Sequence, residues 1–174
     1  MKLWVIAVGH KMPAWAETAT QDYVKRMPAD CAIQIKELKP DINPAKEAVK
    51  IREAIPKGTH IIAMDERGKD LSTQDLANQM SHWRQDGKDI VLLIGGADGL
   101  DPELKKEAAS MIRLSSMTLP HAMARVLLVE QLYRAWTILQ GHPYHRVSHA
   151  LRWLMYTYLY LASQSPRRQE LLQQ

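Results

Sequence analysis

The sequence predicts an α/β domain of three layers, in which helices cover both faces of a mostly parallel β-sheet. Two observations support this prediction. Short strand-like runs alternate along the chain with segments whose apolar residues have helical spacing. One run, residues 89–94 (DIVLLI), is almost continuously apolar, which is typical of a strand covered on both faces. In such folds ligands bind beyond the carboxyl ends of the strands, which selects the loops after residues 64, 94 and 114.

The first half of the chain alternates strands and helices. Residues 3–8 (LWVIAV) form an apolar strand, and the apolar spacing after Pro13 predicts a helix. Residues 32–38 alternate apolar and polar side chains as a half-buried strand does. A helix over roughly residues 44–55 and a strand at 60–64 complete this half.

The second half begins with a predicted turn over Asp65–Lys69. Ser72 with Asp75 indicates a helix N-terminus, because both side chains can accept hydrogen bonds from free backbone N–H groups, and Asp86-Gly87 ends that helix. Asp101-Pro102 begins another helix, in which the missing N–H of proline costs nothing.

A short strand at 111–114 precedes the longest predicted helix, Ala122–Leu139. Apolar residues cover most of the circumference of this helix, so one domain face cannot bury them all. We therefore expect a partner subunit to cover the remainder.

Composition indicates one domain, because 174 residues of which 46% are apolar provide a sizeable core. The single cysteine, Cys31, excludes an internal disulfide, and the apolar run Leu3–Val8 is too short for a signal sequence or a membrane span. We expect a cytoplasmic protein without membrane contact.

The excess positive charge lies outside residues 61–140, which carry nine basic and eleven acidic side chains. This distribution suits contact between the outer segments and a polyanion, around a reaction centre without excess positive charge. An ordinary solvated surface explains the same charges.

Two of the selected loops have the composition of a ligand site. In Gly95–Gly99 the bare glycines let a ligand approach the backbone, although a plain tight turn has the same composition. Ser115–Pro120 can offer backbone groups to an adenine edge and apolar side chains to its ring, although it also suits a helix-capping turn. The turn Gly9–Pro13 lacks G-x-G-x-x-G, which argues against a dinucleotide fold.

Three segments in this order resemble the RlmH-type ribosomal RNA methyltransferases of the SPOUT, or trefoil-knotted, class. They are LLIGGADGL (92–100), LSSMTLPHAMARVLLVEQLYRAW (114–136) and HPYHR (142–146). The opening 28 residues fit the same family, so the resemblance covers residues 1–146.

This resemblance implies a knotted α/β domain at residues 1–146, a homodimer packed through the long helices, and S-adenosyl-L-methionine held in the knot. The family methylates N3 of a pseudouridine in the 23S rRNA of the assembled 70S ribosome. Its cofactor positions fall on Met64, Gly96, Ser115, Ser116, Met117, Thr118, Leu119 and Pro120.

The resemblance also suggests residues on the substrate side. His121 is a candidate to orient the base or take its N3 proton, with a capping or surface role as the alternative. Arg125 is a candidate phosphate ligand, or otherwise an interface or surface charge. The family's tail approaches the pocket, which makes Tyr144 and Arg146 candidate catalytic residues and His145 a substrate contact. Without nearby Cys or carboxylate ligands, the tail histidines do not suggest a metal site.

Residues 147–174 extend beyond the usual end of the family. Residues 159–172 resemble the opening of the Maf-type nucleoside triphosphate pyrophosphatases, with Ser165-Pro166-Arg167-Arg168 as its phosphate loop. Only that first strand and loop are present, so we do not expect nucleotide hydrolysis. A catalytically silent knotted module that binds RNA or ribosomes is the other alternative.

Overall fold

The computed structural model describes residues 1–146, apart from the side chain of Arg146. The predicted extension from residue 147 and its Maf-like run lie outside the described residues. The chain divides after Gln140 into two units, of which the first holds the sheet and the second begins with the short 3₁₀ helix η2 (Pro143–Arg146).

The first unit is a five-stranded parallel sheet between helices, which confirms the predicted three-layer α/β class. Its strands are β1 (Leu3–Val8), β2 (Ile33–Leu38), β3 (His60–Asp70), β4 (Ile90–Ile94) and β5 (Ser110–Arg113), in the order β2-β1-β4-β3-β5.

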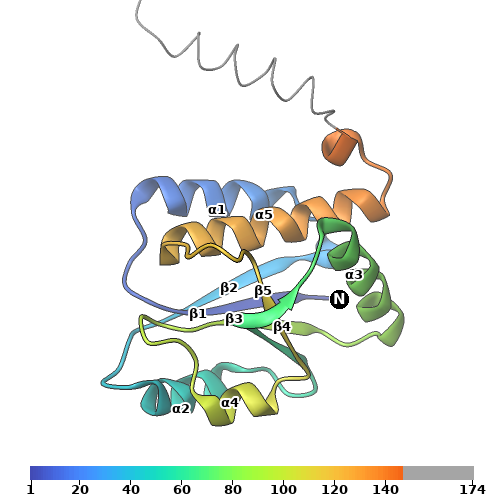
Figure 1. Cartoon of the computed structure of the whole chain (residues 1–174). Coiled ribbons are helices and arrows are strands. Elements are labelled where there is room, and N and C mark those ends of the chain that lie inside the picture. The colour runs from blue at the N-terminus through green and yellow to red at the C-terminus, as the bar shows by residue number, and fades with distance from the viewer. Residues whose placement is uncertain (147–174) are drawn as a thin grey trace, which may run out of the picture. The chain divides into compact units, whose positions relative to one another are not determined.

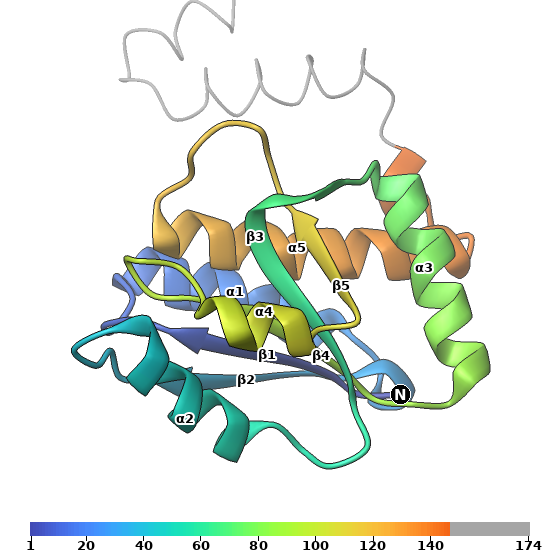
Figure 2. The ribbon, with the colours of Figure 1, turned by 60° about the horizontal axis from the view of Figure 1, so that its bottom comes forward.

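Its helices are α1 (Ala14–Arg26), α2 (Pro44–Ala54), α3 (Thr73–Asp86), α4 (Pro102–Glu107) and α5 (His121–Leu139), with a 3₁₀ turn η1 (Ala29–Cys31). Helices α1 and α5 cover one face of the sheet and α2 and α4 the other, as Figures 1 and 2 show from two sides. Helix α3 packs against α5.

The central strand β4 explains the layering, because all five of its side chains are buried. Alternate residues of a strand point to opposite faces, so such a run must be covered on both. The core between the sheet and the α2/α4 layer consists of Ile6, Val8, Ala48, Ile51, Ala63, Val91, Leu93, Leu100 and Leu104.

The helix ends follow the predicted capping chemistry. At α3 the Ser72 hydroxyl accepts from the Asp75 N–H at 3.0 Å, and the Asp75 carboxylate accepts from the Ser72 N–H at 3.0 Å. Asp101 accepts from the N–H groups of Glu103 and Leu104 at the start of α4.

On α5, Glu130 and Arg134 form the intrahelical ion pair that their spacing indicates, with 2.6 Å between the Arg134 Nη2 and the Glu130 Oε1.

The predicted turn at Asp65–Lys69 is wrong, because β3 continues through it to Asp70. The pairing of β3 with β5 shifts register between Met64 and Lys69, so the polar residues form an irregularity inside the strand. A Cβ at Gly68 would lie 2.5–2.8 Å from the backbone of Ile112 and Arg113, so glycine lets the two chains approach. This glycine and its charged neighbours gave the segment the composition of a turn.

Candidate active site

The strand order brings three segments of the chain together at one edge of the sheet. Strands β4, β3 and β5 are neighbours, and Met64 pairs with Ile94 on one side and Ile112 on the other. Beyond these paired residues lies a cavity of about 740 Å³, a size typical of small-molecule sites. Seven of the eight predicted cofactor residues line it: Met64, Gly96, Ser115, Ser116, Met117, Thr118 and Leu119. The eighth, Pro120, does not line the cavity and stands at the N-cap position of α5.

The two predicted loops are both tight turns and parts of the cavity wall. The Gly99 N–H donates to the Gly96 carbonyl at 3.0 Å, and the Met117 N–H donates to the Ser115 hydroxyl at 2.9 Å. A Cβ at Gly96 would lie 3.1 Å from a carboxylate oxygen of buried Glu47. The same residues therefore form local turns and line the cavity.

Charged side chains complete the wall, and sequence reasoning missed them. Lys105 on α4 holds Asp65 with 3.0 Å between Nζ and Oδ2. Burial acts to raise the pKa of Asp65, but the Arg67 N–H and the Lys105 ammonium outweigh it, so the pKa lies below its ordinary range. The signal that would have found Asp65 and Arg113 is their place at the carboxyl ends of neighbouring strands.

The wall suits S-adenosylmethionine in its chemistry. Arg113 also lines the cavity: its Nη2 lies 3.4 Å from the Asp70 Oδ2, and its buried Nε has no hydrogen-bond partner among the described residues. Acidic and basic side chains stand together with apolar ones such as Ile94 and Leu119. A ligand with an ammonium, a carboxylate and an adenine ring matches this mixture.

The comparison with known families decides the class of the protein. The family model described as "Predicted SPOUT methyltransferase" matches residues 1–145. The chain belongs to the SPOUT methyltransferase family. It is accordingly an enzyme of the methyltransferase class, as the sequence predicted.

Curated SPOUT relatives resemble the chain over nearly their full lengths. The "Ribosomal RNA large subunit methyltransferase H" of Polynucleobacter asymbioticus is 73% identical over 146 residues, which are 84% of this chain and 99% of the relative. The protein of the same name from Polynucleobacter necessarius is 66% identical over the same shares. A solved structure, "a probable methylase family protein" from Haemophilus influenzae, is 15% identical with a TM-score of 0.55, and covers 82% of this chain and 69% of its own. That likeness concerns the fold alone.

Arg125 does not occupy the exposed position that a phosphate ligand of this SPOUT domain needs. Its side chain is fully buried, and Nη1 donates to the Glu37 Oε1 at 2.5 Å. The expected phosphate contact is at odds with this burial, because the guanidinium already has a protein carboxylate. His121, one turn earlier, does not line the cavity and contacts Arg125 instead.

The three tail candidates of the SPOUT chain belong to the second unit. At η2 the Tyr144 N–H donates to the His142 Nδ1 at 3.2 Å, and Tyr144 and His145 are half-buried.

Nowhere in residues 1–145 do three or more His, Cys, Asp or Glu side chains gather as they would around a metal ion. None of the helices in the described residues has the length and apolar character that a membrane crossing requires.

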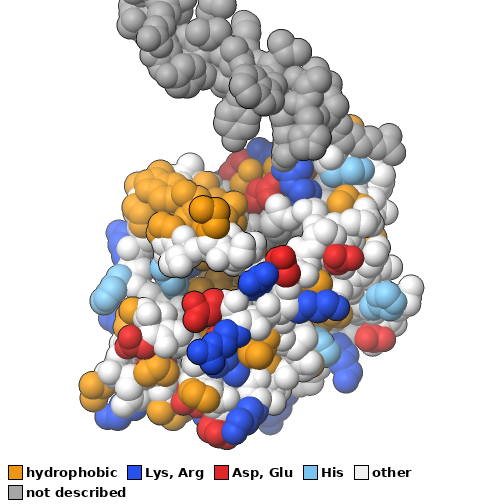
Figure 3. Space-filling view, viewed as in Figure 1, with side chains coloured by type: hydrophobic (Ala, Val, Ile, Leu, Met, Phe, Trp, Pro, Cys, Tyr) orange, Lys and Arg blue, Asp and Glu red, His pale blue; other side chains and the backbone are white. Residues whose placement is uncertain are grey.

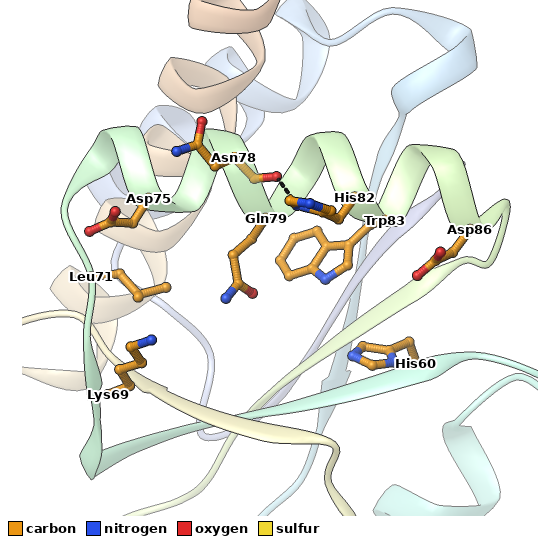
Figure 4. A pocket seen from close by; sticks show the side chains of 9 residues that line it. All are labelled: His60, Lys69, Leu71, Asp75, Asn78, Gln79, His82, Trp83 and Asp86. Atoms are coloured by element: carbon orange, nitrogen blue, oxygen red, sulfur yellow. Dashed lines mark hydrogen bonds between the residues drawn. The ribbon is translucent and has the colours of Figure 1, made fainter.

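A second cavity of about 490 Å³ lies between α3 and β3 (Figure 4). Its wall includes His60, Lys69, Asn78, His82 and Trp83, and none of the predicted site residues. Because it contains none of the predicted cofactor residues, it is the control site in the experiments proposed for this protein.

Proposed function

We propose that this SPOUT enzyme transfers the methyl group of S-adenosylmethionine to N3 of a pseudouridine in the 23S rRNA of the assembled ribosome, and works in the cytoplasm as a trefoil-knotted homodimer. The observation that supports it best is the convergence of Met64, Gly96 and Ser115–Leu119 on one cavity. The names of the 73% and 66% identical relatives point to large-subunit ribosomal RNA as the substrate.

Positioning is the main task of the protein. When bound, S-adenosylmethionine supplies a methyl group that its sulfonium already makes electrophilic. The apolar residues Met64, Ile94 and Leu119 would hold the adenine, and the Arg113 guanidinium would donate to an acceptor of the cofactor. Fixing the methyl group and the target nitrogen in line accounts for most of the acceleration.

The substrate side of the proposal consists of His121 and the tail. His121 would contact the base, while Tyr144, His145 and Arg146 would bind the RNA by stacking and by donating hydrogen bonds. We assign Arg125 no phosphate contact, because its guanidinium is buried against Glu37.

The homodimer part of the proposal has support from an exposed apolar patch. Trp15 at the start of α1, Met117 in the loop before α5 and Met123 in the first turn of α5 are 52%, 78% and 37% exposed. Figure 3 shows hydrophobic side chains gathered where α1 and α5 begin. Patches of this kind are typical of subunit interfaces, and Met117 also lines the cavity.

The oligomeric state tests this part separately. We expect sedimentation to give a dimer for the natural chain and a monomer for a Trp15→Glu/Met123→Glu variant. Val49→Glu is the control, because Val49 is 54% exposed on α2, at the opposite face of the sheet. A natural chain that sediments as a monomer at micromolar concentration would remove the homodimer from the proposal.

The function itself is tested with ribosomes and methyl-labelled S-adenosylmethionine, followed by nucleoside analysis of the RNA. We expect label in 3-methylpseudouridine, and loss of both label and cofactor binding in Thr118→Trp, which fills the cavity from an exposed position. Asn78→Trp, an equally exposed change in the second cavity, is the control and should retain both. Label in another nucleoside would contradict the proposed substrate. Ribosome binding without cofactor binding would favour a catalytically silent module.

A further inference from the structure

Three polar side chains from two distant segments meet at the amino end of α5. The Arg125 guanidinium is fully buried between them. Its Nη1 donates to Glu37 on β2 at 2.5 Å, and its Nη2 lies 3.4 Å from the Nε2 of His121. Glu37 is 44% exposed, so the charge on the buried arginine is balanced from the surface.

Gly9, just after β1, sets the position of the His121 ring. A Cβ at residue 9 would lie 2.7 Å from the His121 Nε2 and 3.1 Å from its Cδ2. The ring therefore rests with its Nε2 edge on the bare glycine while Arg125 approaches the same nitrogen. Among residues 1–145, no group forms a hydrogen bond with the Nδ1 of His121, and this nitrogen is not among the buried atoms that lack a partner.

These contacts determine which ring nitrogen carries the proton. A guanidinium has only N–H donors, so it forms a hydrogen bond with Nε2 only when Nε2 is an acceptor. The neutral ring must then carry its proton on Nδ1. Burial, and then the nearby Arg125 charge, lower the pKa of His121 below its ordinary value, which agrees with a neutral ring.

We propose that Glu37, acting through Arg125, holds His121 in the tautomer with the proton on Nδ1, so that the ring faces the substrate as a hydrogen-bond donor and not as the acceptor of the N3 proton. Glu37 and Arg125 are then positioning residues. The part that concerns the substrate rests on the proposed function.

The proposed target base has acceptors for such a hydrogen-bond donor. N3 of pseudouridine lies between two carbonyl groups, and a donor to either oxygen stabilises the negative charge that appears when the N3 proton leaves to water. The N3 electron pair then forms the bond to the methyl carbon, while the pair of the breaking carbon–sulfur bond stays on sulfur. His121 neither loses nor gains a proton in these steps.

The tautomer is measured first, in the free protein. Long-range ¹H–¹⁵N spectra of the full chain with ¹⁵N-histidine distinguish the two neutral forms, and the signals lost in His121→Asn belong to His121. We expect the proton on Nδ1 in the natural chain, and a shift toward the form with the proton on Nε2 in Arg125→Met. A proton on Nε2 in the natural chain overturns the proposal, and that spectrum decides the point even if Arg125→Met does not fold.

Methyl transfer is measured second, with a matched pair of substitutions. The amide nitrogen of asparagine lies near the place of Nδ1 and that of glutamine near the place of Nε2, and neither amide acts as a base. We expect His121→Asn to keep kcat within about tenfold of the natural value, and His121→Gln to lose about 100-fold, the usual cost of removing such a donor. Equal loss in both variants, with cofactor binding intact, would show that His121 takes the proton and would overturn the proposal. Absence of methyl transfer by the natural chain would contradict the proposed function instead, and the spectra would still determine the tautomer.

Discussion

The cavity wall and the Glu37–Arg125–His121 cluster are built in different ways, although both lie at carboxyl ends of strands. The wall comes from the part of β3 that begins at Met64 and from the loops after β4 and β5, and residues of each of these contiguous segments line it. The cluster depends on one ion pair between residues 88 positions apart. Short sequence motifs can therefore identify a site whose residues lie in a few contiguous segments. They do not show which distant side chain forms the ion pair that controls the tautomer of a histidine.

The largest effect that we expect separates a buried charge from an exposed one. Glu37→Leu leaves the buried Arg125 without its carboxylate and should lower the free energy of unfolding by about 2–3 kcal/mol. This loss of stability is smaller than for an ion pair with two fully buried partners, because water reaches the place of Glu37. Glu103→Leu removes the exposed partner of Lys106 and should change the free energy of unfolding by under about 0.5 kcal/mol. Urea unfolding measures both, and equal small changes would contradict the buried role of the ion pair.

The wall is tested at Arg113. Arg113→Met removes the guanidinium and should weaken S-adenosylmethionine binding about tenfold or more, since a charged hydrogen bond contributes roughly 1.5–3 kcal/mol. Lys106→Met on the exposed side of α4 is the control. Calorimetric titration gives both affinities. Unchanged affinity in Arg113→Met would exclude this arginine as a cofactor contact.

Acidification should affect the two regions in separate pH windows. The pKa of His121 is lowered by burial and by Arg125, so the unfolded chain binds a proton first as the pH falls below the ordinary value of 6.5. Stability is then lost from that pH down to the folded pKa. The pKa of Asp65 is also lowered, but its stabilisation persists until the pH falls below its ordinary value of 3.8. Unfolding of His121→Gln should therefore lose pH dependence only in the upper window, and an unchanged profile would contradict a neutral, half-buried His121 ring.

The smallest effect concerns the glycine under the ring. Gly9→Ala places a methyl group 2.7 Å from the His121 Nε2, and the side chain can move aside, so the stability cost should be under about 1 kcal/mol. The ring must leave Arg125, however, and its tautomer signal should change. A variant with natural stability and natural histidine spectra would show that Gly9 does not position the ring.

The fold could largely be predicted from the sequence because its signals are local. The apolar run of β4, the capping residues of α3 and α4 and the apolar character of α5 correspond to observed elements. The continuation of β3 through Asp65–Lys69 could not be predicted, since it depends on pairing with β5 more than forty residues later. For Arg125 the sequence leaves a phosphate ligand and an interface or surface charge as alternatives, because no local pattern reveals Glu37 as its partner.

We propose that the segments after Met64, Ile94 and Arg113 form the binding site of S-adenosylmethionine. Ultraviolet cross-linking of the methyl-labelled cofactor to the full chain, followed by peptide mapping, tests it most directly. We expect the label on peptides that contain residues 64–67, 95–99 or 114–119, and its loss in Thr118→Trp. Label on the α3 residues that line the second cavity (78, 79, 82 and 83), with none on those three segments, would contradict this assignment.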